Sequence, residues 1–530
     1  MYASVLSLPE LFFLAGVGSV YAVFAVTWFL WYTCKCRKGG NIADSTQILF
    51  FGGGRFIHNA VFLGIAASHL ILPRVDMTRD TPALYAVMIC ASRVLAFITC
   101  TIYWNHLAKL RFKSTEEYLL RRLEDNIPVY AHLINRIIAV CSLLLNYVMY
   151  CESNGVFSVK SLLPFIYLMI SFGSFSALGG VNVILFGCTV LWVIEISGEF
   201  LLLTKTLPYF PKSGLFQRIV SECGDLYSPN LYIMGLAELL TVQPLYTLFQ
   251  SASSASEANA AMGIAVVLAV FGYALSFLTA RCLEGHSGFP IENNTEILHR
   301  IFGVNFDGSN QFTALDNPDE VTTITFTHLV ILLGTRASNT IAFLLLHAHS
   351  ISVHVYQYAL PNWLRLGLVS DGRELHMTYS CLFLLTSYTL TALMMYSSNK
   401  LDAYIPNTPR TAVAMMLAVA TVVMVSPLVR EVWHVPTSVT IALFTLIGVI
   451  ISHQDPVTLI KTCTPQWFAT IIFVPSLLVC IVLSAFLKGS KTANPNLLFR
   501  THLKLRKEQK SGHTNSIVSK ENLRIIKGGM

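Results

Sequence analysis

Charged residues are scarce in this chain of 530 residues: Asp, Glu, Lys and Arg together make up only 12%. That share is about half of what a soluble domain usually carries. The apolar set AVILMFWYC makes up 54%, and a soluble protein of this composition could not cover its surface with polar groups. The composition therefore excludes a soluble globular protein and indicates that lipid surrounds most of the chain.

The chain also lacks the motifs of redox centres, metal sites and common membrane-protein families. None of its twelve cysteines forms a C-x-x-C pair, and neither H-E-x-x-H nor H-x-x-H-H occurs, so we expect no metal and no cofactor. The G-x-x-x-D-R-x-G-R loop of major-facilitator transporters, the D-R-Y motif of rhodopsin-like receptors and an ATP-binding cassette are missing as well. The expected partners are membrane lipids and a small-molecule or ion substrate, not nucleic acid.

Long apolar runs dominate the chain. About thirteen of them approach the ~20 residues that cross a hydrocarbon core. Only "LGG" separates the fifth and sixth runs, so these form a tight helical hairpin or one interrupted element, and twelve helices remain possible. The predicted fold is all-α, a polytopic integral membrane bundle of 12–13 transmembrane helices within residues 1–488. The runs are 9–33, 47–72, 83–104, 128–150, 161–178, 181–203, 231–251, 259–281, 324–347, 376–396, 411–428, 436–453 and 466–487.

Basic loops predict the orientation in the membrane. The stretch "CKCRKGG", the amphipathic loop 105–127 and the tail 489–530 are basic and fall on one side of thirteen spans. We therefore expect an outside or lumenal N-terminus, a cytoplasmic C-terminus with a disordered basic tail, and a plasma-membrane or endomembrane location. The acidic loop 282–323 then lies outside and carries the sequon Asn293-Asn294-Thr295, which makes Asn293 a predicted glycosylation site.

Three carboxylates lie within apolar runs, where a charge costs at least ~2.5 kcal/mol on insertion scales. Glu195 and Glu199 in "LWVIEISGEFLLL" are one helical turn apart and share a helix face. Glu238 belongs to the next run, which also holds Pro244. Counting from the predicted membrane boundaries puts Glu195 and Glu238 about 11–12 Å deep in the outer half. We expect the three acids to bind a proton or a cation.

The intramembrane bases are arginines and histidines. The relay candidates are His58, His132 and His328, and the anion or gating candidates are Arg93, Arg136 and Arg336. With Arg55, four arginines outnumber three glutamates, so ion pairing within the bundle would leave positive charge for an anionic substrate. The predicted function is a membrane transporter or channel, proton-linked and suited to an organic anion.

Two other functions remain open on the sequence. In "LLLHAHSISVHV", His347 or His349 could serve as the base of a membrane-embedded lipid or protein acyltransferase. Alternatively, all charges pair internally and the chain is a non-catalytic membrane scaffold or glycoprotein. The sequence does not predict an oligomeric state.

Overall fold

The fold was examined in a computed structural model. It describes residues 8–39, 59–72, 83–109, 118, 162–207, 229–241, 243–284, 330–331, 333–356, 377–392, 474–475, 477–479 and 482. Most of loop 105–127, nearly all of loop 282–323 with Asn293, the tail 489–530 and the expected spans 128–150, 411–428 and 436–453 lie outside these residues. Those predictions stay predictions.

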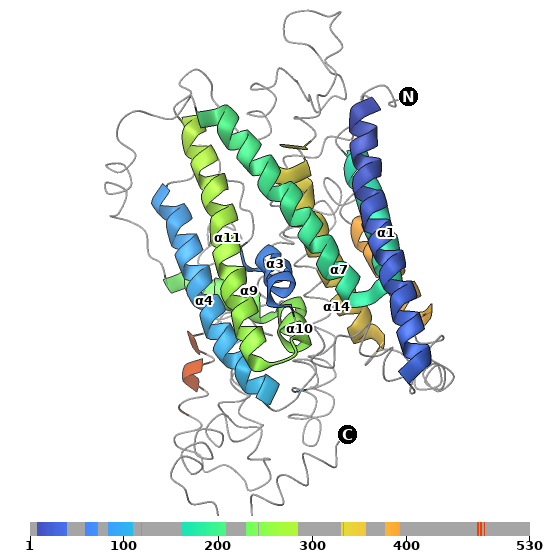
Figure 1. Cartoon of the computed structure of the whole chain (residues 1–530). Helices are drawn as coiled ribbons and strands as arrows, with labels where there is room; N and C mark the ends of the chain where they lie inside the picture. Colours follow the sequence, from blue (N-terminus) through green and yellow to red (C-terminus); the bar gives the residue numbers. More distant parts are fainter. Residues whose placement is uncertain are drawn as a thin grey trace, which may run out of the picture.

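The described part of the chain is almost entirely helical (Figure 1). Four of its helices contain stretches long and apolar enough to cross a membrane, at Leu11–Trp31, Ala86–Asn105, Phe165–Thr204 and Ala255–Thr279. This confirms the prediction of an all-α membrane bundle. The elements are α1 (Leu8–Gly39), α3 (Ala60–Ile71), α4 (Ala83–Lys109), α7 (Leu162–Thr206), α9 (Pro229–Thr241), α10 (Gln243–Ser251), α11 (Ala255–Glu284), the π-helix η3 (Leu333–Ala337), α14 (Ser338–His354) and a helix at 377–392.

Helix α7 consists of two helices that meet at Gly180 and form a V (Figure 1). Gly180 has φ 64° and ψ −152°, a backbone conformation that is essentially restricted to glycine. The fifth and sixth apolar runs are therefore joined directly at this glycine. Side chains from α1 and from the helix at 377–392 bind carbonyl groups near the bend. Tyr21 of α1 donates to the Val183 carbonyl at 3.0 Å, and Ser380 donates to the Ala177 carbonyl at 2.7 Å.

Replacing Tyr21 with Phe should destabilise the bend without changing the packing volume. The Tyr21 hydroxyl is fully buried and also lies 2.6 Å from the Ser176 hydroxyl, so the substitution leaves two buried polar groups with one partner fewer. A loss of about 1–3 kcal/mol follows, seen as a lower melting temperature of the detergent-solubilised protein. Tyr167→Phe changes a 40%-exposed tyrosine in the first half of α7 and should leave the melting temperature unchanged. If Tyr21→Phe and Tyr167→Phe lowered the melting temperature equally, the role given to the Tyr21 hydroxyl would be contradicted.

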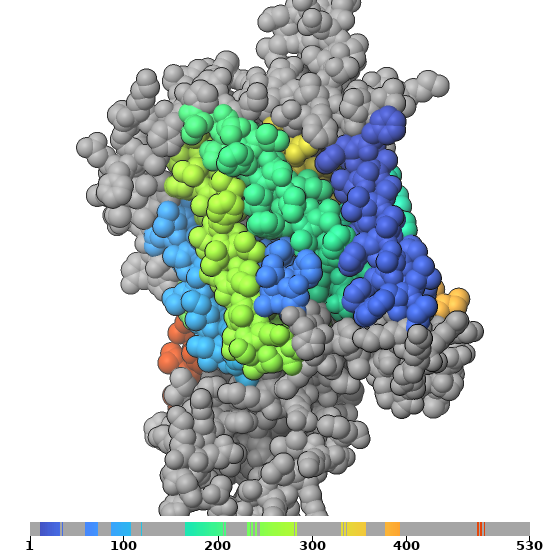
Figure 2. Space-filling view, viewed as in Figure 1, coloured from blue at the N-terminus to red at the C-terminus, as the bar shows by residue number. Residues whose placement is uncertain are grey.

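Helix α3 is the centre of the described packing. It lies between α11 and the second half of α7 (Figures 1 and 2). Gly64 makes the α11 contact possible, because a Cβ there would lie 2.9 Å from the Ala261 carbonyl oxygen and 2.7 Å from the Ile264 side chain. All α3 residues from Leu63 to Ile71 are buried, so the polar side chains at its end, Ser68 and His69, are enclosed by other helices.

The apolar run expected at 231–251 is not one continuous helix. It is divided into α9, which ends at Thr241, and α10, which begins at Gln243. Pro244 stands in the first turn of α10, where its missing N–H costs least. Within the described residues α9 packs along α4 rather than along α7. Glu195 and Glu238 therefore stand on helices that do not pack along each other in the described part of the chain.

Candidate functional site

A buried polar cluster lies where α3, α7 and α14 meet. His69, in the last turn of α3, is 3% exposed and contacts polar groups on two other helices. Its Nδ1 lies 2.9 Å from Oδ1 of Asn339 on α14 and 3.1 Å from Oε2 of Glu195 on α7. Its Nε2 lies 3.2 Å from the main-chain carbonyl oxygen of Cys188, also on α7. One imidazole ring thus connects three helices.

The partners of His69 fit a doubly protonated ring. All three groups around its two nitrogens present oxygen acceptors: an amide, a carboxylate and a main-chain carbonyl. A neutral imidazole would turn a nitrogen lone pair toward at least one of them. The carboxylate of Glu195 supplies the compensating charge, and Nδ1–H points to Asn339 with Glu195 alongside. The carbonyl end of α3 also favours a cation in its last turn. The arrangement therefore suits an imidazolium beside a carboxylate.

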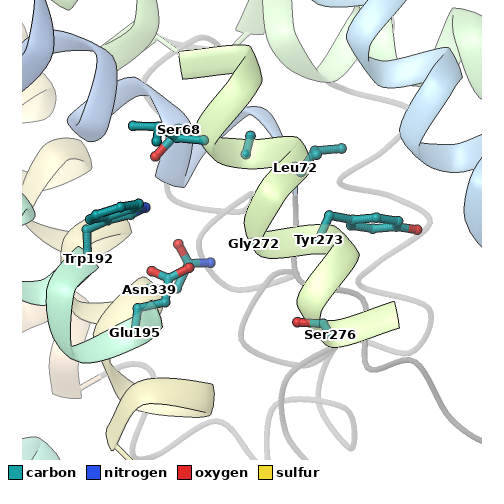
Figure 3. A pocket seen from close by; sticks show the side chains of 10 residues that line it. Ser68, Leu72, Trp192, Glu195, Gly272, Tyr273, Ser276 and Asn339 are labelled. Atoms are coloured by element: carbon teal, nitrogen blue, oxygen red, sulfur yellow. The ribbon is translucent and has the colours of Figure 1, made fainter. Parts of the chain in front are cut away.

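A small polar cavity adjoins the pair (Figure 3). Its volume is about 20 Å³, which holds a water molecule and nothing much larger. The side chains of Glu195 and Asn339 lie together on one side, across from Gly272 of α11 (Figure 3). The lining residues are Ser68, Leu72, Trp192, Glu195, Leu268, Ala269, Gly272, Tyr273, Ser276 and Asn339. Glu195 is therefore placed where it can meet a water-sized species as well as His69.

A glycine pair sets the distance between α7 and the start of α14. A Cβ on Gly198 would lie 2.7 Å from Cα of Gly334, and a Cβ on Gly334 would lie 2.6 Å from Cα of Gly198. Gly334 belongs to the π-helix η3, whose Leu333 carbonyl accepts a 2.9 Å hydrogen bond from the Ser338 hydroxyl. Such π-turns occur often at functional sites. This close crossing brings Asn339 to His69 and Glu195.

Both carboxylates of α7 are enclosed by the bundle. Glu195 stands eleven residues, or about 16 Å along the axis, before the end of the helix at Thr206. Glu195 is 6% exposed and Glu199, one turn further, is 4% exposed. Both sequence-predicted acids of α7 are thus buried, and Glu195 contacts His69.

Of the other predicted residues of the transport site, the structure describes the side chain of Arg93. Arg93 on α4 is half-buried, and its Nη1 donates to the Ile71 carbonyl at 3.4 Å, at the end of α3. This contact stabilises the C-terminus of the helix that carries His69. Glu238 and Arg336 lie in α9 and η3, but their side chains are outside the described part of the chain. So are the whole residues His58, His132, His328 and Arg136.

His347 and His349 are buried in α14, at 0% and 3% exposure. The Nδ1 of His347 binds the Phe343 carbonyl at 2.9 Å within the helix, and the Nδ1 of His349 lies 2.6 Å from the Tyr379 hydroxyl. Both rings are therefore oriented by structural hydrogen bonds. They differ from His69 in facing no carboxylate in these contacts, which favours a role in packing α14.

His69 and Asn339 were not among the predicted site residues. Both stand in apolar runs that held other candidates, His58 and Arg336 respectively. His69 carried the same signal as His58, an ionisable residue within a membrane span. A lone Asn carries a weaker signal, because it is uncharged and common at helix starts.

Comparison with known proteins yields a fold and no family. No protein-family model matches the chain, and no curated protein matches it. A solved structure shares its architecture: the substrate-bound outward-open state of a Na+-coupled sialic acid symporter, with a TM-score of 0.61 and 10% sequence identity. The match covers 90% of this chain and 98% of that one. At 10% sequence identity this structural similarity shows a shared fold alone.

Proposed function

We propose that this protein is a multi-pass membrane transporter that couples proton binding at His69 and Glu195 to the movement of a small organic anion. The observation that carries the proposal is the buried contact between His69 of α3 and Glu195 of α7, next to a polar cavity. Secondary transporters bind their substrates and ions at polar groups inside the bundle, where helices are interrupted. The fold, shared with a symporter, supports the same conclusion.

Proton binding would link three helices. With the proton present, His69 donates to Asn339 and to the Cys188 carbonyl, and its charge attracts Glu195. With the proton gone, Nδ1 turns a lone pair toward the carboxylate of Glu195, and this contact becomes repulsive, whereas the Asn339 amide rotates to donate to Nδ1. The deprotonated site therefore favours separation of α3 from α7. A helix contact that depends on one proton supplies the differential stability that alternating access requires.

The substrate class follows from charge. The intramembrane arginines predicted from the sequence exceed the glutamates, and one glutamate is already paired with His69. The remaining positive charge suits a carboxylate-bearing solute. The ligand named for the structural neighbour, sialic acid, is such an acid and is the first compound to try.

The test is uptake by purified protein in liposomes. A panel of radiolabelled organic anions, sialic acid included, is offered under an imposed pH gradient, under a Na+ gradient and under neither. We expect at least one anion to accumulate under the pH gradient alone, and an uncoupler to abolish that accumulation. Uptake driven only by Na+ would contradict proton linkage. If none of the panel accumulates under any gradient, the organic-anion assignment is wrong.

A further inference from the structure

We infer that the cavity beside Glu195 binds one water molecule, and that this water delivers the coupling proton to Glu195, which passes it on to His69. The inference rests on the proposed function and names the path by which the proton reaches the site. It adds Ser68 of α3 and Ser276 of α11 to the site, as residues that hold the water together with Asn339.

The cavity has the size and the lining that a buried water needs. Its volume of about 20 Å³ holds one water molecule. Polar side chains reach it from different helices: Ser68 from α3, Glu195 from α7, Ser276 from α11 and Asn339 from α14. The Ser68 hydroxyl donates to the Ile65 carbonyl at 2.7 Å, so its oxygen can accept from the water. A buried water makes about three hydrogen bonds, and this lining can supply them.

His69 is not among the described residues that line the cavity, so a proton from the cavity reaches it through a neighbouring group. The ring is 3% exposed, and its nitrogens face Asn339, Glu195 and the Cys188 carbonyl. Of these three partners, the carboxylate is the one that readily takes up and releases a proton. Glu195 both lines the cavity and lies 3.1 Å from Nδ1 of the ring. It therefore stands between the water and His69.

Each proton transfer along this path conserves atoms and charge. A proton that arrives from solvent makes the water a hydronium ion, which gives the proton to an oxygen of the Glu195 carboxylate and is left neutral. The resulting carboxylic acid donates the proton to the lone pair of Nδ1 of neutral His69, while Nε2–H stays directed at the Cys188 carbonyl. The products are the imidazolium and the carboxylate of the protonated site. The reverse sequence releases the proton.

The other charged and titratable groups described around the path have contacts elsewhere. Tyr273 of α11 borders the cavity, but its hydroxyl donates to a main-chain carbonyl of α4 at 2.7 Å, and its ring turns away from Glu195 (Figure 3). Arg93 of α4 binds the end of α3. Glu199 stands one turn further along α7, and α14 presents the neutral Asn339. Glu195 is therefore the group that accepts the proton from the water.

Radiolytic footprinting of the purified protein tests the water site, and no transport substrate is needed. An X-ray pulse turns bound water into hydroxyl radicals, which oxidise adjacent side chains, and Trp192 borders the cavity. We expect Trp192 to be oxidised in the wild type and to lose most of that oxidation in Ser276→Val, whose larger side chain fills the cavity. Ser197→Val makes the same change at an exposed position of α7 and should keep the oxidation. Trp104, which is 1% exposed and does not line the cavity, should stay unmodified throughout.

Proton-driven uptake in liposomes tests the relay. Ser276→Val should slow this uptake by at least about tenfold, because a positioned proton donor contributes at least that much to the rate of a proton transfer. Ser276→Ala removes the hydroxyl but leaves room for the water, so it should keep the oxidation of Trp192 and most of the uptake. Ser197→Val should match the wild type.

Each outcome has a defined meaning. Trp192 that stays unmodified in the wild type, or is modified equally in Ser276→Val, overturns the water site. Oxidation lost in Ser276→Val with unchanged uptake overturns the relay. If Ser276→Val does not fold, Ala269→Val fills the same cavity from the same helix and takes its place. The proposed function fails separately, if the wild type shows an oxidised Trp192 and yet accumulates no anion under a pH gradient.

Discussion

Glu195→Gln should reduce proton-driven uptake by at least about 100-fold. The amide cannot carry the charge that holds the imidazolium of His69, whose ring nitrogen lies 3.1 Å from the carboxylate. Loss of the partner of a buried charge costs about 3–5 kcal/mol, so the ring loses its second proton in the bilayer interior. The measurement is initial uptake of the anion identified in the panel, in liposomes with and without a pH gradient.

Two controls separate this effect from loss of folding. Glu257→Gln changes a half-buried acid in the first turn of α11, away from the site, and should leave uptake unchanged. Glu195→Gln should still catalyse exchange of labelled for unlabelled anion, because exchange needs no net proton movement. Uptake by Glu195→Gln that keeps its dependence on the pH gradient would contradict the assigned role of Glu195.

Gly198→Val should strongly destabilise the described core. The new Cβ would lie 2.7 Å from Cα of Gly334 and 2.7 Å from the Val330 carbonyl oxygen, and neither backbone atom can move without separating α7 from η3. Overpacking costs about 1–3 kcal/mol, and more when backbone is displaced. We expect a marked fall in melting temperature, and loss of uptake even in the protein that remains folded.

The matched control is Gly263→Val on α11. A Cβ there meets nothing within 4 Å, so the change adds the same atoms without a clash. Its melting temperature should stay close to that of the wild type. A Gly198→Val protein as stable as Gly263→Val would show that α7 and η3 are not held at this distance.

The sequence predicts the helices of this protein better than their contacts. Apolar run lengths located α1, α4, α7 and α11, because a bilayer requires about 20 residues per span whatever the partners. The break between α9 and α10 was harder to place, since Pro244 permits either a kink or a new helix start. Helix α7 continues to Thr206, three residues beyond the apolar run that ends at 203, and hydropathy alone does not locate that helix end.

The sequence predicted one of the two ionisable residues of the candidate site, Glu195, and missed the other, His69. A carboxylate in a span is rare enough to mark Glu195 from the sequence alone. Its partner could not be found that way, because His69 precedes it by 126 positions and only the packing of α3 on α7 brings the two together. Gly198 and Gly334 allow α7 to approach η3 closely. In sequence they look like many other glycines in membrane helices.

Proton movement measured together with anion uptake tests the central claim most directly. A pH-sensitive dye is trapped inside liposomes with no pH or Na+ gradient, and the transported anion is added outside. The account predicts acidification of the interior that follows anion uptake in wild-type protein and is absent in Glu195→Gln. Uptake that moves no protons, or acidification of equal size in Glu195→Gln, would contradict it.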